Sequence, residues 1–277
     1  MRLGGPVFAK YNGADGWAKA VKAAGYSAAY SPSMPGVEKK VVEAYRDAAK
    51  ASGIIIAEVG AWSNPLSPDK AEAKKALDNC KACLKLADEL GARCCVNIAG
   101  SRGKKWDGPS PLDLTKETFE MIVFMVRDII DTVKPTKSFY RLETMPWMYP
   151  DSPDSYLELV KAIDREGFAV HFDPVNMISS PQRYFATGPF IKECIEKLGK
   201  KIRSCHAKDI ILGQELTTHL SECLPGTGGL DYKVYLSEVS KLGKDVTVML
   251  EHLPNEAEYV RAAAFIQKTA KEVGVTL

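Results

Sequence analysis

Short apolar runs alternate with longer amphipathic segments along the whole chain. The clearest apolar run, residues 53–59 (GIIIAEV), is continuous and rich in β-branched residues, as expected of a strand covered on both faces. The preceding segment, residues 36–51, places Val37, Val41 and Ala48 on one face of a helix. The pattern therefore predicts a strand, then a helix, and repeats this order.

Turn and capping residues divide the chain into eight such strand–helix pairs. Ser67 and Ser152, each followed by Pro, are predicted to open two of the helices, because Ser is a good N-cap and Pro suits the first turn. The predicted strands cover residues 5–9, 25–31, 53–59, 92–98, 138–144, 168–174, 202–208 and 245–252. The predicted helices cover about 15–24, 36–51, 67–90, 114–133, 152–166, 189–198, 232–242 and 255–273.

Strict alternation of strands and helices implies a parallel sheet with right-handed crossovers. Eight pairs within 277 residues favour a closed (β/α)8 TIM barrel, which typically needs ~250 residues. An open doubly wound sheet would predict a GxGxxG motif after the first strand, where this chain has KYNGADGWAK. We therefore expect one α/β barrel domain over residues 1–277, with its longest loops at 99–111 and 209–230.

In such a barrel the active site lies at the carboxyl ends of the strands. The last four predicted strands end in Glu143, Asp173, His206 and Glu251, and neighbouring strands lie only ~4.8 Å apart. Each residue alone has an ordinary explanation: a solvated or capping carboxylate, or a core histidine. Together, three carboxylates and one imidazole predict a site for a divalent ion, with Mn²⁺, Mg²⁺ or Co²⁺ suited and Zn²⁺ possible.

Five sequence motifs, LET, HFDPVN, CHAKD, PGTGGLDY and MLEH, occur in this order and resemble the xylose-isomerase-like sugar isomerase/epimerase superfamily, including ketose 3-epimerases. The resemblance implies a xylose-isomerase-like TIM barrel with one metal ion, Mn²⁺ foremost. It implies that Glu143, Asp173, His206 and Glu251 are the metal ligands, and that the two glutamates form an acid/base pair. Asn176 stands where many relatives have a histidine.

These residues suit the removal of a proton next to a carbonyl, through an enediolate. Return of a proton to the same carbon inverts it, and return to the neighbouring carbon interconverts an aldose and a ketose. A dehydratase or lyase acting on a keto-sugar or cyclitol would begin in the same way. An apurinic endonuclease would need more metal-binding histidines than the four present. A non-catalytic sugar-binding barrel would need no second glutamate.

Further residues near the strand ends are candidates for substrate contact. His171 lies two residues before Asp173 and should also face the barrel interior, as a substrate contact or as a core hydrogen-bonding group. Glu58 and Asn97 are candidates for groups that support the metal ligands. His252 should point away from the barrel interior. The full set of candidate substrate contacts is Lys208, His171, Trp147, Trp62, Asn176 and Asn97.

Composition limits the classes of binding partner and the cellular location that we expect. A net charge of +2 offers no electrostatic argument for nucleic acid or an anionic membrane. No run approaches the ~20 apolar residues that span a bilayer, and the first residues lack a signal-like apolar region, so we expect a cytoplasmic protein. Seven irregularly spaced cysteines agree with this. A small sugar is the expected substrate, and a homodimer or homotetramer is expected by analogy with the superfamily.

Overall fold

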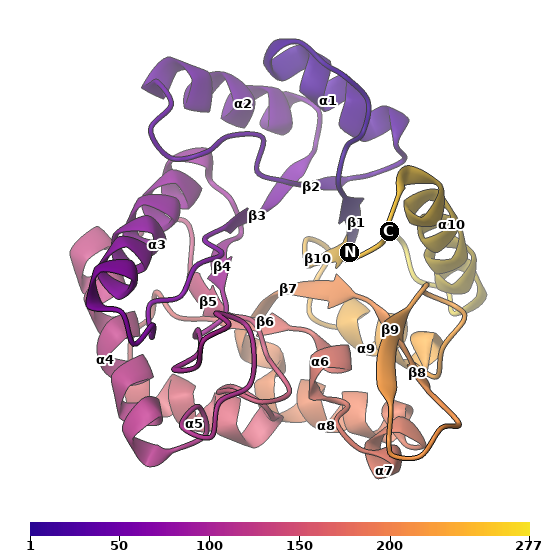
Figure 1. Cartoon of the computed structure of the whole chain (residues 1–277). Coiled ribbons are helices and arrows are strands. Elements are labelled where there is room, and N and C mark those ends of the chain that lie inside the picture. Colours follow the sequence, from indigo (N-terminus) through magenta and orange to yellow (C-terminus); the bar gives the residue numbers. More distant parts are fainter.

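The apolar runs form eight parallel strands that curve into a nearly closed barrel, with helices around the outside (Figure 1). The computed structural model describes all 277 residues. The strands follow the order β5-β4-β3-β2-β1-β10-β7-β6. Their bounds are β1 Arg2–Gly5, β2 Ala28–Tyr30, β3 Ile55–Gly60, β4 Cys94–Asn97, β5 Tyr140–Leu142, β6 Val170–Phe172, β7 Ile202–Ala207 and β10 Thr247–Leu250.

The barrel closes between β5 and β6 at Tyr140. The Tyr140 amide donates to the Gly167 carbonyl at 2.8 Å, and the Tyr140 carbonyl accepts from the Ala169 amide at 3.2 Å. These bonds place β5, β6, β7 and β10 side by side. The four strands that carry the predicted ligands are therefore consecutive around the barrel.

Helices cover the outer surface of the strands (Figure 1). The expected opening of α5 at Ser152 is confirmed, with a capping box to Ser155. The expected opening of α3 at Ser67 is two residues early, because the Asp69 side chain caps the Ala71 and Glu72 amides. The helices are α1 Gly13–Ala23, α2 Lys39–Ala51, α3 Lys70–Leu90, α4 Lys116–Val133, α5 Pro153–Ile163, α6 Pro174–Met177, α7 Pro181–Tyr184, α8 Thr187–Leu198, α9 Tyr232–Ser240 and α10 Glu256–Glu272, with a 3-10 turn η1 at Gly199–Lys201.

The first strand lies earlier than its sequence pattern suggests. Residues 5–9 were the expected strand, whereas β1 is Arg2–Gly5 and contains two glycines. A Cβ on Gly4 would lie 2.6 Å from the Ala28 carbonyl oxygen, so the close approach of β1 to β2 requires glycine. Glycine normally disfavours a strand, which is why the pattern misplaced this one.

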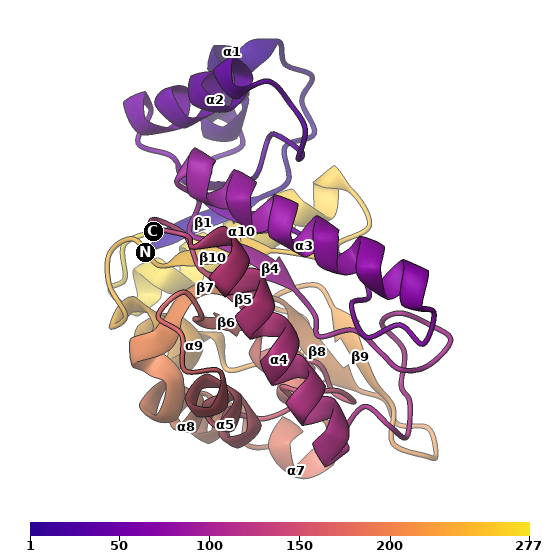
Figure 2. The ribbon, with the colours of Figure 1, turned by 90° about the vertical axis from the view of Figure 1, so that its left-hand side faces the viewer.

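The expected loop at 209–230 contains an antiparallel hairpin, which is a correction to the sequence prediction. Its strands are β8, Asp209–Leu212, and β9, Leu220–Cys223. In the side view the hairpin lies at one end of the barrel and the two chain termini lie toward the other (Figure 2). Because the hairpin directly follows β7, it stands at the end where the carboxyl termini of the strands meet.

One large apolar core fills the space between the strands and the helices, and its members run from Met1 to Ala270. Cys80 and Cys83, which form a CxxC motif, are buried in this core as free thiols, as is Cys95, and Cys94 is also a buried free thiol. Burial raises the pKa of Cys83 to about 12, so this thiol stays protonated at neutral pH. These buried cysteines therefore act as small apolar side chains.

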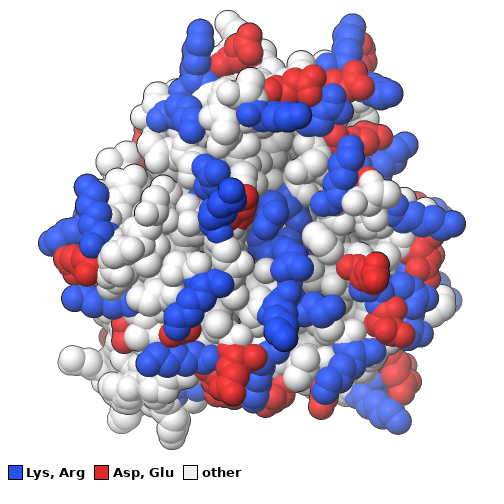
Figure 3. Space-filling view, turned by 180° about the vertical axis from the view of Figure 1, so that it is seen from behind, with Lys and Arg blue, Asp and Glu red and all other residues white.

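Basic side chains gather over the middle of the face opposite to that in Figure 1 (Figure 3). At this amino end of the strands, the buried Arg141 guanidinium donates to the Arg93 carbonyl at 2.6 Å. Arg141 and Arg203 both lie against the Phe139 ring, 5.9 and 5.5 Å from its centroid. The predicted acidic site and these arginines thus lie toward opposite ends of the barrel. None of the helices is both long and apolar enough to span a bilayer.

Candidate functional site

The four predicted ligands converge at the carboxyl end of the barrel. Glu143 directly follows β5, Asp173 follows β6, His206 lies in β7 and Glu251 directly follows β10. One potential ligand atom from each residue lies within 4.8 Å of those from the other three. Asp173, His206 and Glu143 are buried, and Glu251 is nearly so. The register of the parallel strands therefore produces the cluster that the strand ends predicted.

The His206 ring faces the three carboxylates through a single nitrogen. Its Nδ1 lies 2.9 Å from Glu251 Oε2, 3.1 Å from Glu143 Oε1 and 3.7 Å from Asp173 Oδ2. Two ligand atoms that bind the same ion, each at ~2.1 Å from it, lie ~3–4 Å from each other. The donor atoms are therefore spaced as ligands of a shared ion would be.

Asp173 uses its two oxygens differently. Its Oδ1 accepts from the Val175 amide at 2.9 Å and from the Asn176 amide at 3.3 Å, which caps the short helix α6. Its Oδ2 is buried and makes no hydrogen bond of acceptable geometry. Asp173 can therefore cap the helix with one oxygen and bind a metal ion with the other.

Glu251 Oε2 is also a buried oxygen without a properly directed hydrogen bond, although it lies 2.9 Å from both His206 Nδ1 and Lys208 Nζ. Two buried carboxylate oxygens with free lone pairs and one imidazole nitrogen form a mixed oxygen–nitrogen donor set. Such a set fits a hard or borderline divalent cation. The residues present therefore fit the metal ion that the sequence predicted.

Lys208 lies among the carboxylates of this cluster. Its ammonium is 2.9 Å from Asp173 Oδ2, 2.9 Å from Glu251 Oε2 and 3.4 Å from Glu143 Oε1, and the side chain is only 2% exposed. Burial alone would lower the pKa of Lys208, but the surrounding carboxylates raise it well above its ordinary value. With these carboxylates around it, Lys208 therefore carries a positive charge at neutral pH.

The two glutamates experience opposite environments. Burial, and then repulsion from Glu251, raises the pKa of Glu143 to about 7. Burial also opposes ionisation of Glu251, but His206 and Lys208 outweigh it and hold the pKa of that carboxyl below its usual range. Before any cation is added, the pair is therefore suited to carry one proton between two carboxylates.

Asn176 contacts one of these glutamates. Its side-chain amide donates to Glu143 Oε1 at 3.1 Å and to the Thr144 carbonyl at 2.9 Å. Its carbonyl oxygen accepts from Lys208 at 3.5 Å. Asn176 therefore lies within the cluster and helps to hold Glu143 and Lys208 in place.

The other candidate contacts lie in different surroundings. Trp62 and Trp147 are exposed, and Trp147 Nε1 donates to the Asp107 carbonyl at 3.0 Å, which links the loop after β5 to the loop at 99–111. Asn97 instead lies between β4 and α3, with its amide bonded to the Ser63 backbone and to Cys80. Asn97 was expected to face the site, but these contacts show that its side chain packs against α3 on the outer side of the strand.

Two residues near the site were not expected there. Glu222 of β9 lies 3.3 Å from Lys208 Nζ, and its other oxygen lies 2.9 Å from His252 Nδ1. His252 Nε2 is in turn 3.6 Å from Glu251 Oε1, which corrects the expectation that this ring points away. Alternation along the strand fails for His252 because its backbone is left-handed, with φ 56°. Because the hairpin was not predicted, no pattern in the sequence placed Glu222 near the site.

The barrel fold agrees with comparisons to known proteins. Residues 18–269 match the family model described as xylose isomerase-like TIM barrel. The chain therefore belongs to this family. No curated protein matches the sequence significantly.

Several solved structures share the fold across the whole chain at low sequence identity. D-Psicose 3-epimerase from Clostridium cellulolyticum H10, solved with D-tagatose, is 16% identical with a TM-score of 0.72, covering 100% of both chains. A probable 3-DHS dehydratase, AsbF, from Bacillus anthracis is 16% identical with a TM-score of 0.69, covering 96% of this chain and 98% of that one. A xylose isomerase-like TIM barrel protein from Mycobacterium smegmatis in complex with magnesium is 15% identical with a TM-score of 0.66, covering 98% and 97%.

Proposed function

We propose that this protein is a divalent-metal-dependent isomerase or epimerase that moves a proton next to the carbonyl of a small sugar. The observation that carries the proposal is the convergence of Glu143, Asp173, His206 and Glu251 from four consecutive strands, with one buried oxygen of Asp173 and one of Glu251 in no well-directed hydrogen bond. These four residues would hold the ion. When bound, the ion would supply Lewis-acid stabilisation of the negative charge that develops on the substrate oxygens.

The two glutamates are the proposed acid and base. They come from β5 and β10, with β6 and β7 between them, so they approach a substrate at the barrel mouth from different sides. His206 and Asn176 hold Glu143, while His206, Lys208 and His252 surround Glu251. One carboxylate would take the proton from carbon and the other would return one.

Lys208 is proposed to orient the substrate. It is a buried cation that already contacts both glutamates, so a substrate hydroxyl or carbonyl oxygen placed between them would meet its ammonium. Asn176, Trp62 and Trp147 remain proposed contacts, whereas His171 is fully buried beside Glu58 and His206 and is not proposed to touch the substrate. We also propose that residues 1–277 act as a single domain, since one apolar core extends from Met1 to Ala270.

The comparisons support the reaction class and leave the substrate open. The structural relatives include named 3-epimerases, and one relative was solved with magnesium. We propose Mn²⁺ as the first ion to test, with Mg²⁺, Co²⁺ and Zn²⁺ beside it. The relative named as a dehydratase favours elimination as the second candidate, because loss of a leaving group can follow the same proton abstraction.

The test is turnover of a panel of ketoses and keto-sugars by protein loaded with each metal ion, with products separated by chromatography. An epimer, an aldose or a dehydrated product would distinguish the three outcomes. Glu143→Gln and Glu251→Gln should each lower kcat by about 10²- to 10⁴-fold, the usual contribution of a general acid or base. Metal content is measured in each variant, because both residues are also proposed ligands.

Glu238→Gln is the matched control. Glu238 is as little exposed as Glu251, at 14% against 13%, but lies on α9 and pairs with Lys241. This control should keep wild-type turnover. Wild-type rates in both Glu143→Gln and Glu251→Gln would refute the proposed acid/base pair, and metal binding without any turnover would point to a sugar-binding protein.

A further inference from the structure

We infer that Glu58 is a positioning residue that holds the His206 ring so that Nδ1 is presented to the metal site. The inference rests on the proposed function, because it concerns a ligand of the proposed ion. It adds a residue from the opposite side of the barrel to the four that converge at the mouth. Glu58 belongs to β3, and three strands separate β3 from β7 in either direction around the barrel.

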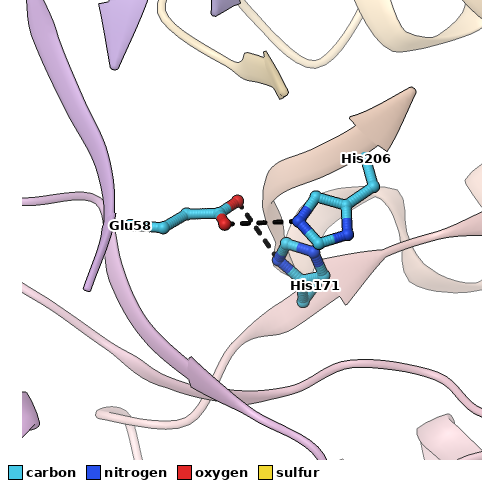
Figure 4. Close-up of side chains that lie close together, drawn as sticks. All are labelled: Glu58, His171 and His206. Carbon is cyan, nitrogen blue, oxygen red and sulfur yellow. Dashed lines mark hydrogen bonds and ion pairs between the residues drawn. The ribbon is translucent and has the colours of Figure 1, made fainter. Parts of the chain in front are cut away.

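Glu58 reaches across the barrel interior to both buried histidines. Its Oε2 lies 3.3 Å from His206 Nε2, and its Oε1 lies 3.7 Å from His171 Nδ1 (Figure 4). The Ser204 hydroxyl, two residues before His206 on β7, also donates to Oε1. Glu58 is 1% exposed and both histidines are fully buried, so these contacts are shielded from solvent.

The two nitrogens of His206 thus face different partners. Nδ1 faces the three carboxylates of the proposed metal site, and Nε2 faces Glu58. A ring that binds a metal through Nδ1 must carry its proton on Nε2. Glu58 Oε2 is the hydrogen-bond partner of that nitrogen. The Glu58 carboxylate therefore favours the tautomer and the ring orientation that metal binding needs.

His171 limits rotation of the same ring. The two imidazoles pack edge to face, with centroids 4.2 Å apart and an interplanar angle of 76°. Neither nitrogen of His171 makes a hydrogen bond, so the ring serves chiefly as a packing partner between Glu58 and His206. The packing of the His171 ring and the contact between Glu58 and Nε2 together fix the plane of the His206 ring.

Glu58, His171 and His206 could instead hold a second ion, because their ligand atoms also lie within 4.8 Å of one another. The contacts favour positioning. Both Glu58 oxygens already accept from Ser204 or His206, and Nε2 cannot carry the proton required by the first site and also bind a second ion. The number of ions bound per chain separates the two interpretations.

The experiment compares Glu58→Gln with Thr247→Val by calorimetric titration of metal-stripped full-length protein with Mn²⁺ or Mg²⁺. Gln keeps the shape of the side chain but loses the charge. Thr247 is buried beside Ser204 in the strand register, and its hydroxyl has no partner, so Thr247→Val changes a neighbouring polar group without touching His206. Glu58→Gln should weaken metal binding by about 10- to 100-fold, and Thr247→Val should leave the affinity unchanged.

A spectroscopic measurement on the Mg²⁺-loaded wild-type protein complements the titration and needs no variant. The His206 Nε2 proton should give a downfield resonance that exchanges slowly with water, as expected of a buried proton donated to a carboxylate. In Glu58→Gln this resonance should move upfield while the remaining spectrum keeps its native dispersion. A merely structural role for Glu58 would change stability without this specific shift.

The outcomes separate the two levels of the proposal. Wild-type protein that binds no divalent ion would refute both the proposed function and the role of Glu58. Wild-type protein that binds one ion, with equal affinity in Glu58→Gln, would refute only the role of Glu58. Two ions per chain, reduced to one by Glu58→Gln, would overturn positioning in favour of direct ligation. If Glu58→Gln fails to fold, absence of a protected Nε2 proton in the wild-type protein would still refute it.

Discussion

Asp173 shows how a single residue can serve both the fold and the site. One oxygen caps α6 through two backbone amides, and the other is buried, faces the cluster and lies 2.9 Å from Lys208. The capping bonds fix the rotamer of the side chain, so the second oxygen is held in place before any ion arrives. Burial opposes ionisation of Asp173, but Lys208 and His206 hold its pKa below its usual range.

Asp173→Asn should separate these two roles. Asn is as good an N-cap as Asp, so α6 should stay folded, but loss of the buried charge beside Lys208 should lower the free energy of unfolding of the metal-free protein by about 3–5 kcal/mol. Metal affinity should fall by more than the ~10- to 100-fold typical of losing a group behind a ligand, because a charged ligand is removed. Chemical denaturation and calorimetry measure the two effects. Unchanged metal affinity would show that Asp173 is a cap alone.

At the scale of secondary-structure elements, the segment after β7 is arranged around Asp209. The Asp209 carboxylate accepts from the amides of Ile210 and Gly226 at 2.8 Å, and from Gly228 and Leu230 at 3.0 Å. A Cβ on Gly228 would lie 2.3 Å from the Ile210 carbonyl oxygen, so this position requires glycine. The PGTGG motif is therefore explained as the backbone that closes around Asp209.

Asp209→Ala should release this segment and with it the β8–β9 hairpin that carries Glu222. Loss of a buried, charge-assisted network should lower the free energy of unfolding by about 2–3 kcal/mol. Hydrogen exchange should rise in residues 209–230 and stay slow in the barrel strands. Uniform destabilisation, without faster exchange in this segment, would contradict a local role.

Asp88 on α3 similarly anchors the segment that leads into β5. Its Oδ1 accepts from the amides of Thr136, Lys137 and Ser138 at 2.8, 2.6 and 3.0 Å. Partial burial opposes ionisation, but the amides of Lys137 and Ser138 outweigh it and lower the pKa of Asp88. The folded protein therefore stabilises the charged form, and this contribution is lost as the pH falls through the folded pKa.

Asp88→Asn should lower the free energy of unfolding by about 1–2 kcal/mol at pH 7, a modest value because the carboxylate is partly solvated. The difference from wild type should shrink below about pH 4, where the unfolded carboxyl is protonated, and continue to shrink as the folded one titrates. Urea denaturation of both proteins at pH 7 and below about pH 4 measures this difference in the free energy of unfolding. A difference that grows on acidification would contradict the sign.

At the scale of the whole molecule, the sequence predicted the number of barrel strands, their order and the convergence of Glu143, Asp173, His206 and Glu251. Each of these follows from local periodicity combined with one general rule about where barrel strands end. Tertiary contacts that leave no local pattern were missed. Glu222 reaches the site through a hairpin, the exposed His252 ring turns toward Glu251 through a left-handed backbone, and Asn97 faces α3.

A proton transfer beside a carbonyl leaves an isotopic trace that can be measured directly. Metal-loaded protein and its preferred ketose are incubated in deuterated water, and the recovered sugar is analysed by mass spectrometry and by the position of the label. Deuterium should enter at the carbon next to the carbonyl during turnover, and both turnover and labelling should stop after chelation of the metal. Turnover that leaves the sugar unlabelled, or labelling that survives complete removal of the metal, would contradict metal-dependent proton transfer by this site.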